Sequence, residues 1–130
     1  MSILPSVMVV DDEEELAHLF MEFLKGSGYN TVAFTDPLLA LEHFRSNPEQ
    51  YSLILSDLRM PGMNGIDLAK RIRDYNSRVK ILLITAFYDI ENQNSDADLK
   101  EANISTVLKK PIKLTELRTQ VNLLCNGRLS

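Results

Sequence analysis

The sequence has almost no cysteine, on which disulfide-linked proteins depend, and no long apolar run, which a membrane-spanning helix requires. Cys125 is the only cysteine, so neither a disulfide within the chain nor a cysteine-based zinc site can form. No apolar run approaches the ~20 residues that a transmembrane helix needs, and residues 1–5 lack the basic start of a signal peptide. We therefore expect a cytoplasmic protein without membrane insertion.

Basic residues are also in the minority. The 14 lysines and arginines face 18 aspartates and glutamates, which gives a net charge of -4 at pH 7. Because binding to a phosphate backbone requires clustered basic residues, we do not expect this segment to bind nucleic acid directly. The glycine patterns of nucleotide-binding loops, G-x-G-x-x-G and G-x-x-x-x-G-K-[ST], do not occur.

The length and composition are those of one ordinary globular domain. The chain has 130 residues, of which 45% are hydrophobic and 25% are charged, and this is too short for two independent cores. We predict one domain over residues 1–125, followed by a terminal tail or linker stub at residues 126–130.

Five short apolar runs predict five strands, at residues 6–10, 31–34, 53–55, 80–85 and 106–109. The first run lacks polar alternation, which is typical of a strand buried on both faces of a sheet. Apolar residues at helical spacing lie between and after the runs. They are Leu16, Leu19, Phe20, Phe23 and Leu24, then Leu38, Leu41 and Phe44, then Ile66, Ala69 and Ile72, and finally Leu114, Leu117, Val121 and Leu124.

A further helix is expected within residues 89–103. This segment is rich in poor helix formers, so we expect the helix to be short, frayed or mobile. Strands that alternate with helices predict an α/β fold in which a parallel sheet carries helices on both faces.

Five polar side chains stand where the strands end. They are Asp11 and Asp12 after the first strand, Asp57 after the third, Thr85 at the end of the fourth and Lys110 after the fifth. In such folds ligands bind outside the carboxyl ends of the strands, so the five side chains are expected to converge on one rim. Carboxylates ~4 Å apart repel by about 1 kcal/mol in water and nearer 4 kcal/mol at an effective dielectric of ~20. They therefore need a proton, a metal or a cation among them.

The chemistry of these five residues favours phosphoryl transfer. Oxygen ligands without histidine or cysteine favour Mg²⁺, or Mn²⁺ in its place. A lysine neutralises an anion as a point charge, and a threonine hydroxyl donates to a phosphoryl oxygen. A metal, Lys110 and Thr85 around one remaining carboxylate would suit transfer of a phosphoryl group onto that carboxylate.

Four pieces of the sequence carry a resemblance to a known family. They are the apolar strand that ends in Asp11-Asp12, the segment Leu-Ile-Leu-Ser-Asp57-Leu-Arg-Met-Pro-Gly-Met-Asn-Gly, the segment Leu-Leu-Ile-Thr85-Ala86, and Lys110-Pro111. Over essentially its whole length the chain resembles a response-regulator receiver domain of two-component phosphorelay systems, the CheY-like superfamily. The resemblance implies a flavodoxin-like five-stranded parallel sheet with strand order 2-1-3-4-5.

The resemblance also implies a role for each carboxylate. Asp57 would be the phosphoacceptor, which takes a phosphoryl group from a phosphohistidine of a histidine kinase or a histidine phosphotransfer protein. Asp12 and Asp57 would be direct Mg²⁺ ligands together with the backbone carbonyl of Arg59, and Asp11 would act through bound water. The domain would catalyse only its own phosphorylation and dephosphorylation, so we do not expect an enzyme in the ordinary sense.

Other positions are implied to contact or tune the phosphoryl group. Lys110 would bridge to it, with a cis peptide before Pro111, and Thr85 would bond it. The small Ala86 would leave the phosphoryl group reachable by a donor. Arg59 and Phe87 occupy the positions that tune phosphoryl lifetime in this family, and because both are bulky we expect a fairly long-lived acyl phosphate.

One position departs from the family. Three residues before the site lysine the family usually has an aromatic switch residue, and here it has Val107. A valine cannot swing between exposed and buried rotamers with the same change in area, so we expect activation to run through residues 89–103 instead. The expected output is a changed association, with an effector or a second copy, through the face formed by the fourth helix, fifth strand and last helix.

Three other functions are compared with the same residues. A phosphorylation-independent interaction domain on the same scaffold remains open as an alternative. A metal-dependent phosphohydrolase would carry D-x-D after the first strand, whereas the sequence reads Asp11-Asp12-Glu13. An FMN-binding flavodoxin would need a phosphate-binding Ser/Thr loop at the same place. Gly62 and Gly65 are interpreted as turn residues.

Overall fold

Five parallel strands form one sheet in the computed structural model, which describes residues 4–86 and 96–126. The strands are β1 (Ser6–Val10), β2 (Asn30–Phe34), β3 (Leu53–Asp57), β4 (Lys80–Thr85) and β5 (Thr106–Lys109). Their order in the sheet is β2-β1-β3-β4-β5. The predicted fold class and strand order are therefore confirmed.

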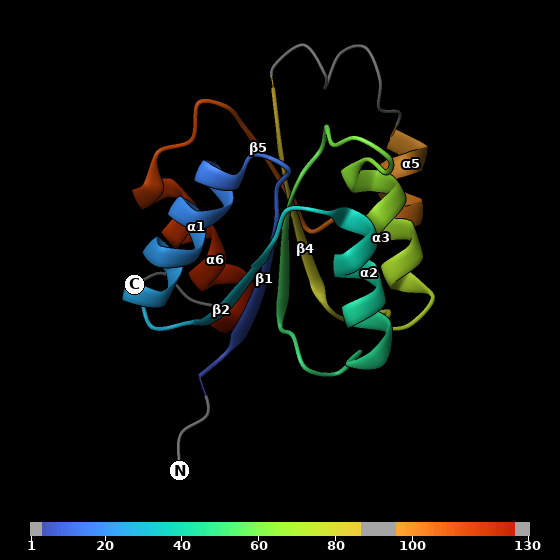
Figure 1. Cartoon of the computed structure of the whole chain (residues 1–130), viewed down its shortest axis with the longest axis horizontal. Helices are drawn as coiled ribbons and strands as arrows, with labels where there is room; N and C mark the ends of the chain where they lie inside the picture. The colour runs from blue at the N-terminus through green and yellow to red at the C-terminus, as the bar shows by residue number, and fades with distance from the viewer. Residues whose placement is uncertain (1–3, 87–95, 127–130) are drawn as a thin grey trace.

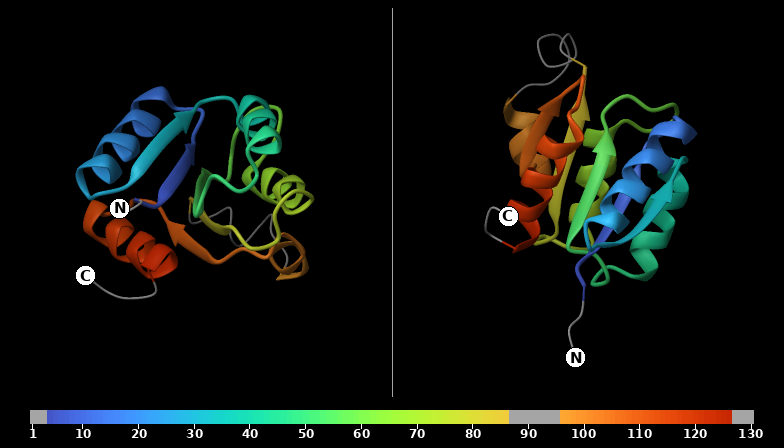
Figure 2. Two further views of the ribbon diagram at one scale, coloured as in Figure 1. Left: turned by 90° about the horizontal axis from the view of Figure 1, so that it is seen from below. Right: turned by 90° about the vertical axis from the view of Figure 1, so that its left-hand side faces the viewer.

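Helices cover both faces of this sheet (Figures 1 and 2). In the described part of the chain they are α1 (Glu14–Gly26), α2 (Pro37–Ser46), α3 (Gly65–Arg73), α5 (Asp96–Ala102) and α6 (Leu114–Asn126). Helices α1 and α6 pack on one face, and α2, α3 and α5 pack on the other. No helix among the described residues is long and apolar enough to cross a membrane.

Alternate side chains of each strand divide the core into two halves. In β1, Met8 and Val10 belong to the cluster beneath α2 and α3, whereas Val7 and Val9 belong to the cluster beneath α1 and α6. All four are buried, because a parallel sheet covered on both faces offers no exposed side to its central strands. Burial of such side chains stabilises the fold by about 1.5–3 kcal/mol each.

Two leucines of the apolar stripes noted in the sequence are exposed in the structure. Leu19 is 46% exposed and Leu38 is 54% exposed. A helix turns by about 100° per residue, and in α1 the buried stripe is centred on Ala17, Phe20 and Leu24. Leu19 therefore lies beyond the edge of the stripe, and a small residue, Ala17, takes the buried place.

The remaining helix predictions are met in part. In the predicted segment 89–103 the structure describes α5, which has seven residues, and residues 89–95 lie outside the described residues. Helix α6 extends through Asn126, one residue into the predicted tail, and residues 127–130 are also outside.

Candidate functional site

The carboxyl ends of four strands bring the predicted site residues to one edge of the sheet. Asp57 pairs with Ile84 in the sheet, and Thr85 pairs with Lys109. The N–H of Lys110 donates to the carbonyl oxygen of Thr85 at 2.8 Å. The parallel topology thus places the ends of β1, β3, β4 and β5 beside one another, as the sequence predicts.

Three carboxylates gather at this edge. Asp11, Asp12 and Asp57 each offer an oxygen, and these oxygens all lie within 4.8 Å of one another. Asp11 is 2% exposed and Asp57 is 7% exposed, whereas Asp12 is exposed. The N–H of Glu13 donates to Oδ1 of Asp11 at 2.9 Å, which fixes the orientation of that side chain.

Burial makes these negative charges unfavourable. It raises the pKa of Asp11 to about 6, against the lowering effect of the Glu13 N–H, and the charge of Asp57 raises it further. Burial also raises the pKa of Asp57, and the nearby Lys110 opposes that rise. Nζ of Lys110 lies 3.4 Å from Oδ1 of Asp57. The site therefore holds more negative charge than its one lysine balances.

Replacing Asp11 by asparagine is expected to stabilise the metal-free protein at neutral pH. The pKa of Asp11 is 3.8 when unfolded and about 6 when folded, so stability falls as pH rises from ~4 to ~6. The rise of about 2 in pKa corresponds to at most about 3 kcal/mol. An asparagine oxygen also accepts the Glu13 hydrogen bond. In EDTA, the melting temperature of Asp11→Asn should exceed that of the wild type at pH ~7.5 and equal it at pH ~4.

The exposed Asp12 offers the matched control, because its replacement by asparagine removes a charge without relieving burial. Equal melting temperatures of Asp11→Asn and the wild type at pH ~7.5 would contradict the effect of burial.

Thr85 completes the buried part of the edge. Its side chain is 1% exposed, and its hydroxyl donates to the carbonyl oxygen of Ala86 at 3.2 Å. Ala86 itself is half-buried. The Lys110–Pro111 peptide is cis, as the resemblance implies.

Of the three residues that the resemblance implies to tune or switch the site, Arg59, Val107 and Phe87, the structure describes the first two. Arg59 is exposed and, with Met60, Pro61 and Asn64, lines a shallow cavity of about 320 Å³. Phe87 lies outside the described residues. Val107 is half-buried and packs against the core cluster beneath α2 and α3, so its side chain is already in the interior on the side of α5.

Gly65 is a residue whose role the sequence analysis did not find. It is the first residue of α3 and not a turn residue. A Cβ atom at this position would lie 2.5 Å from the carbonyl oxygen of Asp57 and 3.1 Å from Cα of Leu58. The N–H of Gly65 donates to the carbonyl oxygen of Leu58 at 2.8 Å. The missing side chain lets α3 begin directly against the strand end that carries Asp57.

An apolar groove beside Lys110 is a second feature that the sequence does not predict. It has a volume of about 490 Å³, and its lining residues come from α1 and from the segment after β5: Leu16, Leu19, Phe20, Lys110, Pro111, Ile112 and Leu114. The exposed Leu19 is part of this lining. Leu19 has the same helical spacing as the buried Leu24 of α1. The spacing alone therefore does not predict that Leu19 is exposed.

Comparison with known proteins agrees with this geometry. Residues 7–122 match the family described as "Response regulator receiver domain". The chain is 31% identical over 116 residues to the response regulator receiver protein CpdR of Brucella abortus, covering 88% of this chain and 92% of the relative. It is 28% identical over 115 residues to the sporulation initiation phosphotransferase F of Bacillus subtilis, covering 88% and 89%.

Solved structures show the same likeness. The receiver domain of the Francisella response regulator 1452 superposes with a TM-score of 0.79 at 30% identity, covering 95% of this chain and 98% of that domain. A receiver domain protein from Clostridium thermocellum gives a TM-score of 0.86 at 22% identity, covering 95% and 96%, and supports the fold alone. The chain therefore belongs to the response regulator receiver domain family, whose members are signalling modules.

Proposed function

We propose that this receiver domain is a phosphorylation-dependent switch in which Asp57 accepts a phosphoryl group from a phosphohistidine. The observation that carries the proposal is the position of Asp57, whose carboxylate lies 3.4 Å from the amine of Lys110 and among the oxygens of Asp11 and Asp12. An oxygen of Asp57 attacks phosphorus, an O–P bond forms, and the P–N bond to the donor imidazole breaks. The electron pair of that bond stays on the imidazole.

The carboxylate cluster suits Mg²⁺. Its donors are all oxygen atoms, which Mg²⁺ prefers, and burial leaves two of the carboxylates in need of a counter-charge. We assign Asp12, Asp57 and the backbone carbonyl of Arg59 as direct ligands, and Asp11 as a ligand through water. A bound Mg²⁺, or Mn²⁺, supplies positive charge to the phosphoryl oxygens.

Lys110 and Thr85 hold the transferred group. The ammonium of Lys110 neutralises one phosphoryl oxygen, for which it exchanges its contact with Asp57. The hydroxyl of Thr85 turns from the carbonyl oxygen of Ala86 to donate to another phosphoryl oxygen. Each of these contacts is made only when the phosphoryl group is present, so each one favours the phosphorylated conformation.

The expected output is altered association through the face of α5, β5 and α6, with an effector or with a second copy of the chain. The proposed phosphoryl donor is a histidine kinase or a histidine phosphotransfer protein, and the proposed setting is the cytoplasm. The DNA-binding response regulator MtrA of Mycobacterium tuberculosis is 36% identical over 117 residues, and this chain covers 48% of it. Because that longer relative is described as DNA-binding, a DNA-binding effector is one output partner that we propose for this chain.

Incubation with phosphoramidate and Mg²⁺, followed by intact mass measurement, tests the proposed function. We expect one phosphoryl adduct per chain, and we expect its formation to be lost when EDTA removes the metal. A chain that takes no adduct under any of these conditions would instead be a phosphorylation-independent interaction domain on the same scaffold.

Arg59 and Phe87 are proposed to slow hydrolysis of the acyl phosphate by hindering the attacking water. Replacing both by alanine should shorten the half-life of the adduct several-fold, measured by intact mass after the donor is removed. The single replacements serve as controls, with intermediate half-lives expected. A longer half-life in the double variant would contradict this role.

A further inference from the structure

Helix α5 has little apolar surface to hold it in place. It comprises seven residues, and helices this short are not stable alone. Ala102 is fully buried and Leu99 packs half-buried against the core, whereas Ala97, Lys100 and Glu101 are exposed. The position of α5 therefore depends on contacts that other elements make with it.

Helix α3 supplies one pair of such contacts through Lys70. The Nζ atom of Lys70 lies 3.1 Å from Oδ1 of Asp98 and 3.3 Å from Oε2 of Glu101. The two carboxylates are three residues apart and so lie on the same side of α5. The side chain of Lys70 is 29% exposed, whereas those of Asp98 and Glu101 are 43% and 68% exposed, so only the lysine end of this bridge is partly shielded from solvent.

Arg73, one turn further along α3, holds the end of α5. Its Nε donates to the carbonyl oxygen of Ala102 at 2.8 Å, and its Nη2 donates to that of Asn103 at 2.8 Å. Asn103 has a φ of +51°, and the N–H of Ile104 donates to the carbonyl oxygen of Leu99, which is a left-handed helix ending. The cation thus binds carbonyl groups at the negative end of the α5 dipole.

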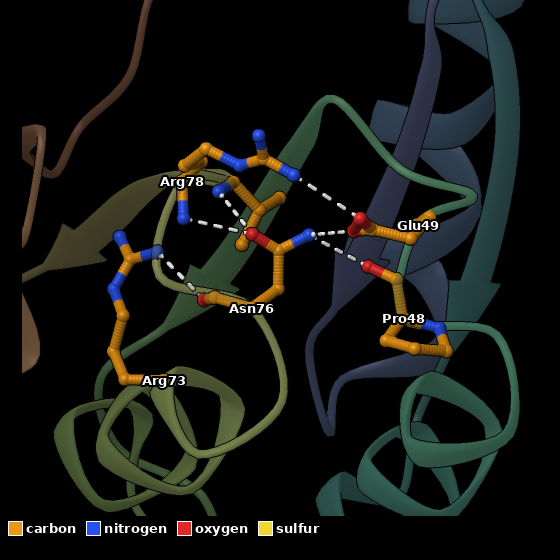
Figure 3. A network of polar contacts seen from close by, with 6 residues as sticks. Pro48, Glu49, Arg73, Asn76 and Arg78 are labelled. Carbon is orange, nitrogen blue, oxygen red and sulfur yellow. Dashed lines mark hydrogen bonds and ion pairs between the residues drawn. The ribbon is translucent and has the colours of Figure 1, made fainter.

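The side chain of Arg73 is itself held by Asn76 (Figure 3). Nη1 of Arg73 donates to the carbonyl oxygen of Asn76 at 3.2 Å. The side chain of Asn76 donates to the carbonyl oxygen of Pro48 at 2.7 Å and accepts from the N–H groups of Arg78 and Val79. Arg73 is therefore oriented from two sides, and its guanidinium joins the loop after α3 to the end of α5.

The other end of α3 rests on the site. Gly65 packs directly against the carbonyl oxygen of Asp57 and bonds to that of Leu58. Helix α3 thus runs from the strand end that carries Asp57 to the two cations that hold α5. Small sliding motions of packed helices are one known form of conformational switching, so a displacement of the strand end at Asp57 would reach Lys70 and Arg73 through α3.

We propose that α3 couples the Asp57 site to α5, and that Lys70 and Arg73 are the positioning residues of this coupling. The inference rests on the proposed function. In the family, the resemblance implies that an aromatic switch residue in β5 connects the site to the output face. This chain has Val107 at that position, and we assign the connection to Lys70 and Arg73 of α3 instead.

Amide hydrogen exchange of residues 96–104 in the full chain tests the coupling, with and without beryllofluoride and Mg²⁺. We compare the wild type with Lys70→Met and Arg73→Met. The matched control is Arg71→Met, which removes an exposed cation from the same helix. Because Arg73 makes several charged hydrogen bonds, Arg73→Met should speed basal exchange of this segment by about tenfold or more.

The response to beryllofluoride separates coupling from a merely structural role. In the wild type and in Arg71→Met, the exchange rate of residues 96–104 should change when beryllofluoride binds. In Lys70→Met and Arg73→Met, this change should be less than half as large. Lys70→Arg, which keeps the charge, should restore it. An undiminished response in both methionine variants would overturn the proposal, as would a response lost in Val107→Ala but kept in those variants.

Intact mass after phosphoramidate treatment is measured on every variant. An adduct on all of them with an unaltered exchange response refutes the coupling alone. A wild type without an adduct refutes the proposed function and the coupling with it.

Discussion

Asp57→Asn is expected to take no phosphoryl group from phosphoramidate and Mg²⁺, and to remain folded. The amide has nearly the shape of the carboxylate but lacks the anionic oxygen that attacks phosphorus. Burial raises the pKa of Asp57, so a neutral side chain is favoured in this position when no metal is bound. Intact mass should show the wild-type adduct and none on the variant, and thermal unfolding should show no loss of stability.

Asp67→Asn is the matched control. Asp67 is an exposed aspartate in the first turn of α3, outside the three-carboxylate cluster, and its variant should be phosphorylated like the wild type. An adduct that persists on Asp57→Asn would place the phosphoacceptor elsewhere, and peptide mapping would then identify the residue.

Gly65→Ala is expected to destabilise the fold and to slow phosphorylation. The added methyl group would stand 2.5 Å from the carbonyl oxygen of Asp57 and 3.1 Å from Cα of Leu58. Both are backbone atoms, so the clash cannot be relieved by turning a side chain as it could at the nearby Leu83. Overpacking of this kind costs about 1–3 kcal/mol, from which the better helix propensity of alanine subtracts at most about 1 kcal/mol. The melting temperature should fall by roughly 5 °C.

Gly26→Ala provides the comparison for this variant. Gly26 is the last residue of α1, and no atom lies within 4 Å of a Cβ built there, so its replacement should leave phosphorylation unchanged and should not lower stability. A Gly65→Ala variant as stable and as readily phosphorylated as Gly26→Ala would show that α3 does not need its close approach to Asp57.

The parts of the fold that follow from local pattern could be predicted from the sequence. β4 (Lys80–Thr85) and β5 (Thr106–Lys109) span the same residues as the runs that predict them, because short runs of apolar, β-branched residues favour strands. The meeting of Asp11, Asp57 and Lys110 follows from the parallel direction of the strands. The strand order came from the resemblance, since periodicity does not determine which strands are neighbours.

The parts that depend on packing between distant segments could not be predicted. Lys70 and Asp98 are 28 residues apart in sequence, and nothing in either segment indicates the other. In the sequence Gly65 cannot be distinguished from a turn glycine. Its role becomes apparent only in the structure, where it lies against the carbonyl oxygen of Asp57. Leu19 and Leu38 share the helical spacing of their apolar neighbours, and only the packed structure shows which side of each helix is buried against the sheet.

The gathering of carboxylates at the strand ends has a consequence for how the domain is assayed. A cation that binds the folded chain and not the unfolded one raises the unfolding free energy by RT ln(1 + [cation]/Kd), or about 1.4 kcal/mol for each tenfold excess over Kd. If the site binds Mg²⁺ as proposed, melting curves recorded across a Mg²⁺ titration would report the affinity of the site without any phosphodonor. If the proposed site binds Mg²⁺, the thermal stability of this domain would also depend on the concentration of free Mg²⁺ around it.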